Sequence, residues 1–265
     1  MKVSLIVTTY DRPDALAAVL ASVARQTRLP DETLVVDDGS DGRTAAAVRQ
    51  FDAKVPGLKH LWQPHEGFRP ARMRNWGILE AAGQYVVLVD GDMVLHRRFI
   101  ADHAAAAVTG RYLQGVRLPL TARATAAYLR RPRAIAPWHV DGLPKVKYLI
   151  RSAMLGRFFS SRPHGRLTRI HSCNQSYWRD DLMEINGFDE RYNDYGGEDV
   201  DLCARLAMIG VLQQRLRFVA LAYHLHHPPG ANWQHVAQWP RSSHRAERGI
   251  DEHLPQRVRA PRRSA

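Results

Sequence analysis

The sequence predicts an α/β fold with a mostly parallel central sheet flanked by helices. Three continuous apolar runs, at residues 3–9, 33–37 and 84–89, have the length and composition of buried strands. Segments with helical signals alternate with these runs along the first half of the chain. This alternation is typical of parallel sheets, because a helix carries the chain back between one strand and the next.

Local patterns indicate the remaining elements. Pro13 opens the first helix, because proline suits a first helical position, and apolar residues then recur at helical spacing. The first half continues with a helix at 43–53, a strand at 58–62 and a helix at 71–83 that ends on Gly83. The later elements are a strand near 167–172, a helix at 198–209 and a last strand at 217–223.

The positive charge of the chain is concentrated in two segments. The formal net charge is +12, but residues 123–169 hold eleven Lys and Arg against one acid, and residues 241–265 hold seven Arg against three acids. Such charge can indicate a nucleic-acid-binding protein, yet no zinc-finger spacing, RNA-binding motif or basic heptad accompanies it. We therefore expect a basic insert at 123–169 and a flexible basic tail at 240–265, and no nucleic-acid partner.

Neither the cysteines nor the hydropathy indicates secretion or a membrane span. Cys173 and Cys203 lie far apart and give no disulfide framework. The apolar run at the N-terminus is shorter than that of a signal peptide, and no run approaches the roughly 20 apolar residues of a membrane helix. We expect a cytoplasmic protein, whose basic insert leaves open a peripheral contact with the inner face of a membrane.

A pair of carboxylates follows the strand at 84–89. Asp90 and Asp92 flank Gly91, and their charges repel each other unless a cation lies between them. Oxygen ligands at a strand end suit a hard divalent cation such as Mn²⁺ or Mg²⁺. A turn with solvated carboxylates is the alternative, because Asp-x-Asp alone is weakly specific.

Three other segments carry polar side chains of possible chemical use. In "YGGEDVD", residues 195–201, two glycines precede an acidic helix start, where a carboxylate can act as a general base or only cap the helix. In "AYHLHHPP", residues 222–229, histidines near a strand end offer metal ligands or a structural role. "DDGS", residues 37–40, forms either a ligand-binding edge or a tight turn.

Together these motifs resemble the family 2 glycosyltransferases of GT-A fold. The matching segments are "VSLIVTTYDRPDALAAVLASVARQT", "VVDDGSDG", "RPARMRNWGI", "YVVLVDGDMV" and "NGFDERYNDYGGEDVDLCARL". The last is similar to the subgroup of chondroitin-type polymerases and β-1,4-galactosyltransferases. The resemblance covers residues 3–227. It implies one Rossmann-like domain at 1–239, with a nucleotide-sugar-binding half at 1–120 and an acceptor and catalytic half at 121–239.

The resemblance implies which residues bind the nucleotide-sugar donor. In relatives, the ends of the first two strands hold the base and ribose, and the third helix region faces the donor. The matching positions are Thr8, Tyr10, Asp11, Asp38, Arg74, Asn75 and, nearer the ribose, Asp90. UDP is the nucleotide that the resemblance favours.

The resemblance also implies a metal site. A divalent cation, Mn²⁺ or Mg²⁺, is expected on Asp92 and on a late histidine, for which the match gives His224, with His226 as the alternative. Gly91 departs from relatives, which have a bulkier residue there. We expect that departure to leave metal binding intact.

For catalysis and the acceptor, the matching residues lie around the Gly-Gly turn. Asp199 is the implied base, Glu198 is expected to orient the acceptor, and Tyr195 stands where relatives often have Trp. The implied reaction is an inverting transfer of a hexosyl or N-acetylhexosaminyl group to a glycan or lipid-linked acceptor, as in bacterial polysaccharide or lipopolysaccharide synthesis. Nucleotidyl transfer is the rival enzyme class, but it leaves Gly-Gly-Glu-Asp unexplained.

The basic insert has two interpretations. Residues 145–159, "KVKYLIRSAMLGRFF", place Val146, Leu149, Ile150 and Ala153 at helical spacing between basic residues. The helix either packs over the active site or lies on an anionic bilayer as a basic amphipathic helix.

Overall fold

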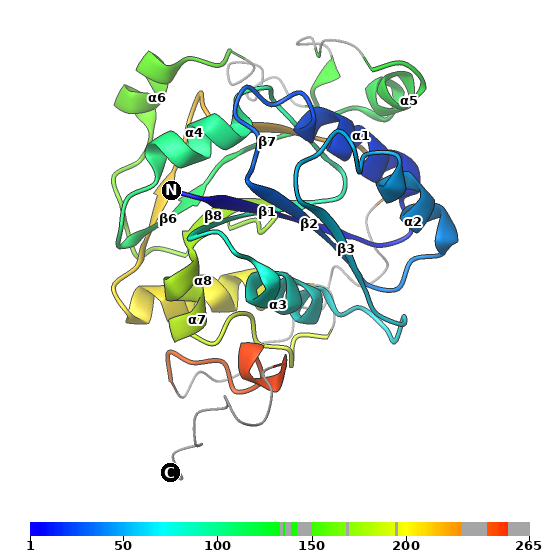
Figure 1. Cartoon of the computed structure of the whole chain (residues 1–265). Helices are drawn as coiled ribbons and strands as arrows, with labels where there is room; N and C mark the ends of the chain where they lie inside the picture. Colours follow the sequence, from blue (N-terminus) through cyan, green and yellow to red (C-terminus); the bar gives the residue numbers. More distant parts are fainter. Residues whose placement is uncertain are drawn as a thin grey trace.

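The chain folds around a seven-stranded sheet, seen edge-on through the centre of Figure 1. The computed structural model describes residues 1–132, 135, 139–141, 150–167, 170–193, 196–228 and 243–253. In spatial order the strands are β3 (Leu58–Trp62), β2 (Glu32–Asp37), β1 (Val3–Thr9), β4 (Tyr85–Asp90), β8 (Asn174–Trp178), β6 (Arg111–Gln114) and β9 (Leu212–Arg215). Only β8 runs antiparallel to its neighbours, so the prediction of a mostly parallel sheet is confirmed.

Helices cover both faces of this sheet (Figure 1). One face packs against α1 (Pro13–Val23), α2 (Gly42–Arg49) and α4 (Phe99–Ala106), and the other against α3 (Pro70–Glu80), α7 (Arg179–Glu184) and α8 (Glu198–Met208). Successive side chains of β1 serve the two cores in turn, because a strand directs alternate residues to opposite faces. No helix in the described residues combines the length and apolar character that crossing a bilayer requires.

A second, three-stranded sheet lies beside the first and completes the edge where β4 ends. It consists of β5 (Met93–Leu95), β10 (Leu221–His224) and β7 (Val116–Pro119). β10 runs antiparallel to β5 and parallel to β7, and its last residue, His224, faces Met93 in the register. This pairing brings His224 and the residues after it next to Asp92. Two short helices, α5 (Ala122–Arg130) and α6 (Ala153–Phe159), belong to the basic insert.

Two predicted strands are displaced in the structure, for identifiable reasons. The strand expected near 167–172 lies at 174–178, where buried Asn174, Gln175 and Ser176 make hydrogen bonds instead of presenting an apolar run. The last strand begins at Leu221 and not at 217, because Phe218 and Ala220 have positive φ angles, which strands do not use.

Part of the expected tail packs against the domain. Ala246 and Ile250 are buried, and Ile250 joins the core beneath α3, α7 and α8. A short 3₁₀ helix, η3 (Ile250–His253), closes this segment against α3. The prediction of a flexible tail over 240–265 therefore differs from the structure for residues 243–253, whose apolar residues are too sparse to be recognised as core. The rest of the predicted tail lies outside the described residues.

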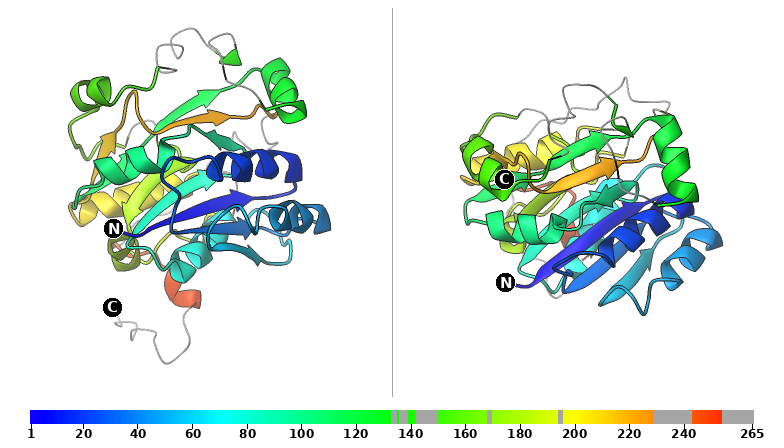
Figure 2. Two further views of the ribbon diagram at one scale, coloured as in Figure 1. Left: turned by 45° about the horizontal axis from the view of Figure 1, so that its top comes forward. Right: turned by 90° about the horizontal axis from the view of Figure 1, so that it is seen from above.

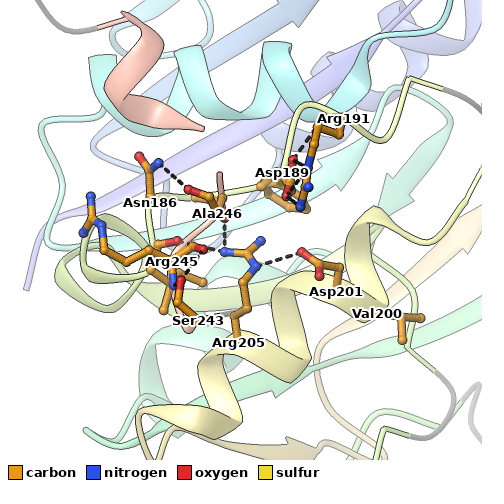
Figure 3. A network of polar contacts seen from close by, with 12 residues as sticks. Asn186, Asp189, Arg191, Val200, Asp201, Arg205, Ser243, Arg245 and Ala246 are labelled. Carbon is orange, nitrogen blue, oxygen red and sulfur yellow. Dashed lines mark hydrogen bonds and ion pairs between the residues drawn. The ribbon is translucent and has the colours of Figure 1, made fainter. Parts of the chain in front are cut away.

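Arg205 of α8 anchors the chain segment on which this tail rests (Figure 3). Its buried guanidinium donates to Asp201 at 2.8 Å and to the carbonyl oxygens of Ile185 and Gly187 at 2.8 and 2.7 Å. Asn186, between those carbonyls, donates to the carbonyl oxygen of Ala246 at 2.9 Å. The buried Arg205 thus holds α8 and the 185–187 turn together. This turn also binds the C-terminal segment around Ala246.

The first prediction concerns this anchor. Arg205→Met removes the cation that pairs with the buried Asp201 carboxylate and donates to two carbonyl oxygens, so we expect the free energy of unfolding to fall by about 3–5 kcal/mol. Urea denaturation followed by circular dichroism measures the change. The matched control is Arg43→Met, which removes an exposed ion pair with Asp41 and should alter stability little. Equal, small effects of both substitutions would contradict the anchoring role.

Candidate active site

A cavity of about 580 Å³ lies at the carboxyl ends of β1 and β4, beside the start of α8. Parallel sheets bind their ligands at this edge. Among the residues expected from the sequence, the cavity is lined by Thr8, Tyr10, Asp38, Arg74, Asp90, Asp92, Glu198, Asp199 and His224. Asp11 and Asn75 are not among its lining residues, and Tyr195 lies outside the described residues.

The Asp90–Asp92 turn is held close to the end of β1. The N–H of Gly91 donates to the carbonyl oxygen of Thr8 at 2.7 Å. A Cβ atom at Gly91 would lie 2.9 Å from Oγ1 of Thr9 and 3.1 Å from that carbonyl oxygen, so a larger side chain has no room here. The departure from the bulkier residue of relatives is therefore a packing requirement of this turn.

Arg74 joins the two halves of the site. Its guanidinium lies 2.9 Å from Oε1 of Glu198 and 3.3 Å from Oδ1 of Asp90, so one buried cation bridges the end of β4 and the start of α8. Burial alone lowers the pKa of an arginine, but the two carboxylates outweigh it and raise the pKa of Arg74 above its ordinary value. The second carboxylate oxygen of Glu198 is buried and has no hydrogen-bond partner in the described structure, which leaves it for a ligand.

Asp92, His224 and His227 form a cluster of possible metal ligands. One nitrogen or oxygen from each lies within 4.8 Å of the others, and Nε2 of His224 and of His227 are 3.5 and 3.4 Å from Oδ2 of Asp92. Oδ1 of Asp92 is buried and unpartnered among the described groups. This set of one carboxylate and two imidazoles suits a divalent ion such as Mn²⁺.

His227 takes the place that the sequence suggested for His226. On a continuing strand, His226 would share the face of His224, because side chains two residues apart point the same way. β10 ends at His224, however, and the N–H of His226 donates to Oγ1 of Thr125 while its side chain is exposed. The chain then turns His227 back toward Asp92. The expectation for His224 agrees with this cluster, whereas that for His226 does not.

Two arginines that the sequence did not single out supply positive charge at this cluster. Arg12 lies 2.9 Å from Oδ2 of Asp92, and Nη2 of Arg117 lies 3.1 Å from Nε2 of His224. Burial, followed by the nearby Arg117 cation, lowers the pKa of His224 to about 3, so its ring is neutral, the form that binds metals. Burial and the charge of Asp90 raise the pKa of Asp92 to about 6.

Asp199 sits at the start of α8 with a pKa suited to proton transfer. Gly196 and Gly197 precede the helix with φ angles of 91° and 96°, which side-chain-bearing residues rarely adopt. The Asp199 carboxylate accepts from the N–H groups of Val200 at 2.8 Å and Ser172 at 3.3 Å. Burial, then the neighbouring Glu198 charge, raises the pKa of Asp199 to about 6. A carboxylate in this range can remove a proton near neutral pH.

The opposite end of the cavity offers an aromatic surface and a fixed carboxylate. Tyr10 stacks on His65 with ring centroids 4.6 Å apart and planes 14° apart. Asp38, at the end of β2, accepts from Nε2 of Gln63 and from the N–H of Arg69, both at 2.6 Å. A planar heterocycle against Tyr10 and a polar group near Asp38 are the partners that this arrangement suits.

Two residues expected at the donor site make contacts within the protein. Asn75 is fully buried, and its amide donates to the carbonyl oxygen of Phe188 and accepts from the Phe188 N–H, at 2.9 and 2.8 Å. Asp11 has a φ of 46°, and its N–H donates to Oγ of Ser40 at the turn after β2. The adjacent Arg74 faces the cavity because neighbouring helix residues point about 100° apart.

The family relationship of the chain is clear from comparison with known proteins. Residues 4–158 match the family described as glycosyl transferase family 2, and residues 155–228 match the one described as the N-terminal domain of galactosyltransferase. The chain is 26% identical over 253 residues to hyaluronan synthase of Pasteurella multocida, covering 86% of this chain and 25% of that protein. It is 29% identical over 226 residues to validoxylamine A glucosyltransferase of Streptomyces hygroscopicus subsp. limoneus, covering 78% and 48%. The chain thus spans about a quarter to a half of these relatives.

Solved structures show the same fold. Staphylococcus aureus TarS in complex with UDP-GlcNAc superposes with a TM-score of 0.61 at 19% identity, covering 89% of this chain and 62% of that one. The mannosyltransferase PcManGT from Pyrobaculum calidifontis, in complex with GDP-Man and Mn²⁺, gives a TM-score of 0.57 at 20% identity, covering 88% and 58%. The fold is therefore that of the GT-A glycosyltransferases.

The structural role of Asn75 is the second prediction. Asn75→Ala removes the donor and the acceptor that hold the Phe188 backbone, and we expect the free energy of unfolding to fall by about 1–3 kcal/mol. Thermal and urea unfolding measure this. Thr8→Val is the control, since Oγ1 of Thr8 is buried without a partner in the described residues and its loss should leave stability unchanged. Unchanged stability of Asn75→Ala would return Asn75 to a ligand-binding role.

Proposed function

The chain belongs to glycosyl transferase family 2, and from that premise we propose that it moves a sugar from a UDP-linked donor to a hydroxyl group of a glycan or lipid-linked acceptor, with inversion at the anomeric carbon. The observation that carries this proposal is the bridge of Arg74 between Asp90 and Glu198. The proposal is supported by the cluster of Asp92 with two histidines and by the raised pKa of Asp199, because Asp92, His224, His227 and Asp199 all line the same cavity.

The donor occupies the end of the cavity formed by β1 and β2. The uracil stacks against the exposed ring of Tyr10, and Asp38 lies within reach of its polar edge or of the ribose. The diphosphate then extends toward Asp92, where Arg12 and Arg117 supply positive charge. UDP as the nucleotide is supported by the TarS complex with UDP-GlcNAc, which shares this fold.

A divalent cation fits the residues at this point. Asp92 offers an unpartnered carboxylate oxygen, and His224 is neutral because its pKa is lowered to about 3. Arg12 pairs with Oδ2 of Asp92, and we propose that it would turn toward the diphosphate once a cation is bound. When bound, the cation neutralises charge that develops on the leaving nucleotide diphosphate. Mn²⁺ is supported by the PcManGT complex, and Mg²⁺ by the carboxylate ligand.

Asp199 acts as the general base in this proposal. Its carboxylate takes the proton of the acceptor hydroxyl as that oxygen bonds to the anomeric carbon, while the bond from that carbon to the nucleotide diphosphate breaks. Glu198, whose free oxygen is buried beside the cavity, accepts a hydrogen bond from the acceptor sugar. Tyr195 is retained as the proposed aromatic platform. A single displacement of this kind inverts the configuration and needs no second nucleophilic carboxylate.

The acceptor class in this proposal is supported by the relatives. Hyaluronan synthase, chondroitin synthase and poly(ribitol-phosphate) β-N-acetylglucosaminyltransferase are among the bacterial proteins that match. We therefore place the reaction in the synthesis of a bacterial surface polysaccharide or lipopolysaccharide. Nucleotidyl transfer, the rival reaction, leaves Asp199 without a proton to remove from a sugar.

The metal site gives the third prediction. His227→Ala removes one of three proposed ligands, so Mn²⁺ affinity measured by calorimetry in the presence of UDP should fall at least about tenfold. Even the loss of a residue that only contacts a metal ligand can lower metal affinity by about this factor. His226→Ala changes an exposed neighbour that points elsewhere and is the matched control. EDTA should abolish sugar transfer by the unmodified protein. Equal Mn²⁺ affinities of the two variants, or transfer in excess EDTA, would remove the cluster from the proposal.

The base gives the fourth prediction. Because only the ionised carboxylate removes a proton, kcat/KM should rise about tenfold per pH unit up to pH 6 and level off above it. Asp199→Asn should lower turnover by roughly 10²–10⁴ and abolish the rise of kcat/KM with pH, while UDP affinity stays within a few-fold of the unmodified protein. A nucleotide-sugar panel with Mn²⁺ identifies the donor to use. An Asp199→Asn variant that keeps near-normal turnover would exclude Asp199 as the base.

A further inference from the structure

Large apolar side chains gather on the surface around α6. Ile150, Met154, Phe158 and Phe159 expose 65%, 68%, 74% and 53% of their surface. Among the described residues, only one other large apolar side chain, Met208, exceeds half exposure. Scattered apolar residues are normal on a protein surface, but four within ten residues form a patch that needs a partner. We call these four residues the α6 patch.

The fold holds the α6 patch in place with its apolar side outward. Gly156 packs on the loop after β9, where an added Cβ would lie 2.9 Å from Cγ1 of Val219 and 3.1 Å from the carbonyl oxygen of Arg217. Ser152 caps α6 and donates its N–H to the carbonyl oxygen of Phe218 at 2.8 Å. Met154 and Phe158 are one helical turn apart and share a face. The exposure is thus set by a docked helix.

The segment that carries the α6 patch is basic and contains no acidic residue. Residues 150–167 contain four arginines and no Asp or Glu. Arg151 is paired at 2.5 Å with the buried Asp102 of α4, which fastens the segment to the domain. Arg157, Arg162 and Arg166 are exposed. An exposed apolar helix in a segment with three exposed arginines complements an anionic interface with an apolar interior.

We propose that the α6 patch docks the protein on an anionic lipid bilayer, with Met154 and Phe158 inserted among the acyl chains and the arginines at the headgroup phosphates. A short apolar segment of this kind can insert into a bilayer, because interfacial binding needs only a few buried apolar side chains and basic neighbours. A second copy of the chain would set arginines against arginines. A stable protein interface needs about 20–30 residues per side, more than this short segment offers.

Docking through this surface leaves the cavity accessible. No residue of α6 lines the cavity, which lies where β1 and β4 end. In Figure 1 and in both views of Figure 2, α6 lies on the side of the molecule where β1 begins. The expectation that this helix covers the active site therefore does not hold for residues 153–159, and residues 142–149 lie outside the described residues. The inference does not depend on the proposed reaction.

Vesicle flotation of the full chain tests the proposal. Vesicles are made of phosphatidylcholine alone or mixed with phosphatidylglycerol, and each mixture is tested at low and high salt. The apolar variant is M154S/F158S, with V108S/M208S as its control, since Val108 and Met208 are also exposed but do not belong to residues 150–159. The charge variant is R157Q/R162Q/R166Q, with the exposed pair R49Q/R97Q as its partial control. Unfolding curves and donor hydrolysis confirm that each variant is folded.

The unmodified protein should bind only the vesicles with phosphatidylglycerol and release them as salt rises. M154S/F158S should weaken binding at least about tenfold, and each arginine removed should weaken it about fivefold. Both controls should bind within about twofold of the unmodified protein. The proposal is overturned if the patch variants bind like their controls or if the unmodified protein binds neither kind of vesicle. A dimer that M154S/F158S dissolves, without vesicle binding, would assign the surface to a second copy instead.

Discussion

The site depends on one buried arginine between two carboxylates. Arg74 lies within 3.3 Å of Asp90 and 2.9 Å of Glu198, and these residues come from helix, strand and helix segments far apart in the sequence. The carboxylates that line the cavity would repel each other, and a planar guanidinium with several donors can contact two of them at once, which a lysine ammonium does less well. Asp92 and Asp199 line the same cavity outside this bridge, and the pKa of each is raised to about 6.

Contacts outside the cavity hold Arg74 in position. Its guanidinium lies 5.4 Å from the ring of Phe188, whose backbone is held by Asn75 of the same helix. The preceding turn is held by Arg205 and by the C-terminal segment around Ala246 (Figure 3). The buried network therefore couples the fold of the last described residues to the geometry of the site.

Much of the fold could be predicted because β1, β2 and β4 are buried on both faces and read as continuous apolar runs. β8 could not, since its polar side chains are paired inside the protein, as Asn174 is with His103. The carboxylates of the site follow these recognisable strands or the Gly-Gly turn, so their residue numbers were accessible. His227 and Arg117 were not, because one depends on where β10 ends and the other on how β7 and β10 pair. Asn75 was expected at the donor site from its place in the motif, and the motif does not reveal that its amide is buried and bonded to the Phe188 backbone.

We propose that Arg74 neutralises Asp90 and Glu198, whereas a metal ion binds to Asp92, His224 and His227. The anomalous scattering of Mn²⁺ in crystals grown with UDP tests it most directly. The account predicts one peak within bonding distance of Asp92, His224 and His227, with Arg12 moved away and Arg74 still between its two carboxylates. A peak between Asp90 and Glu198, with Arg74 displaced, would contradict it.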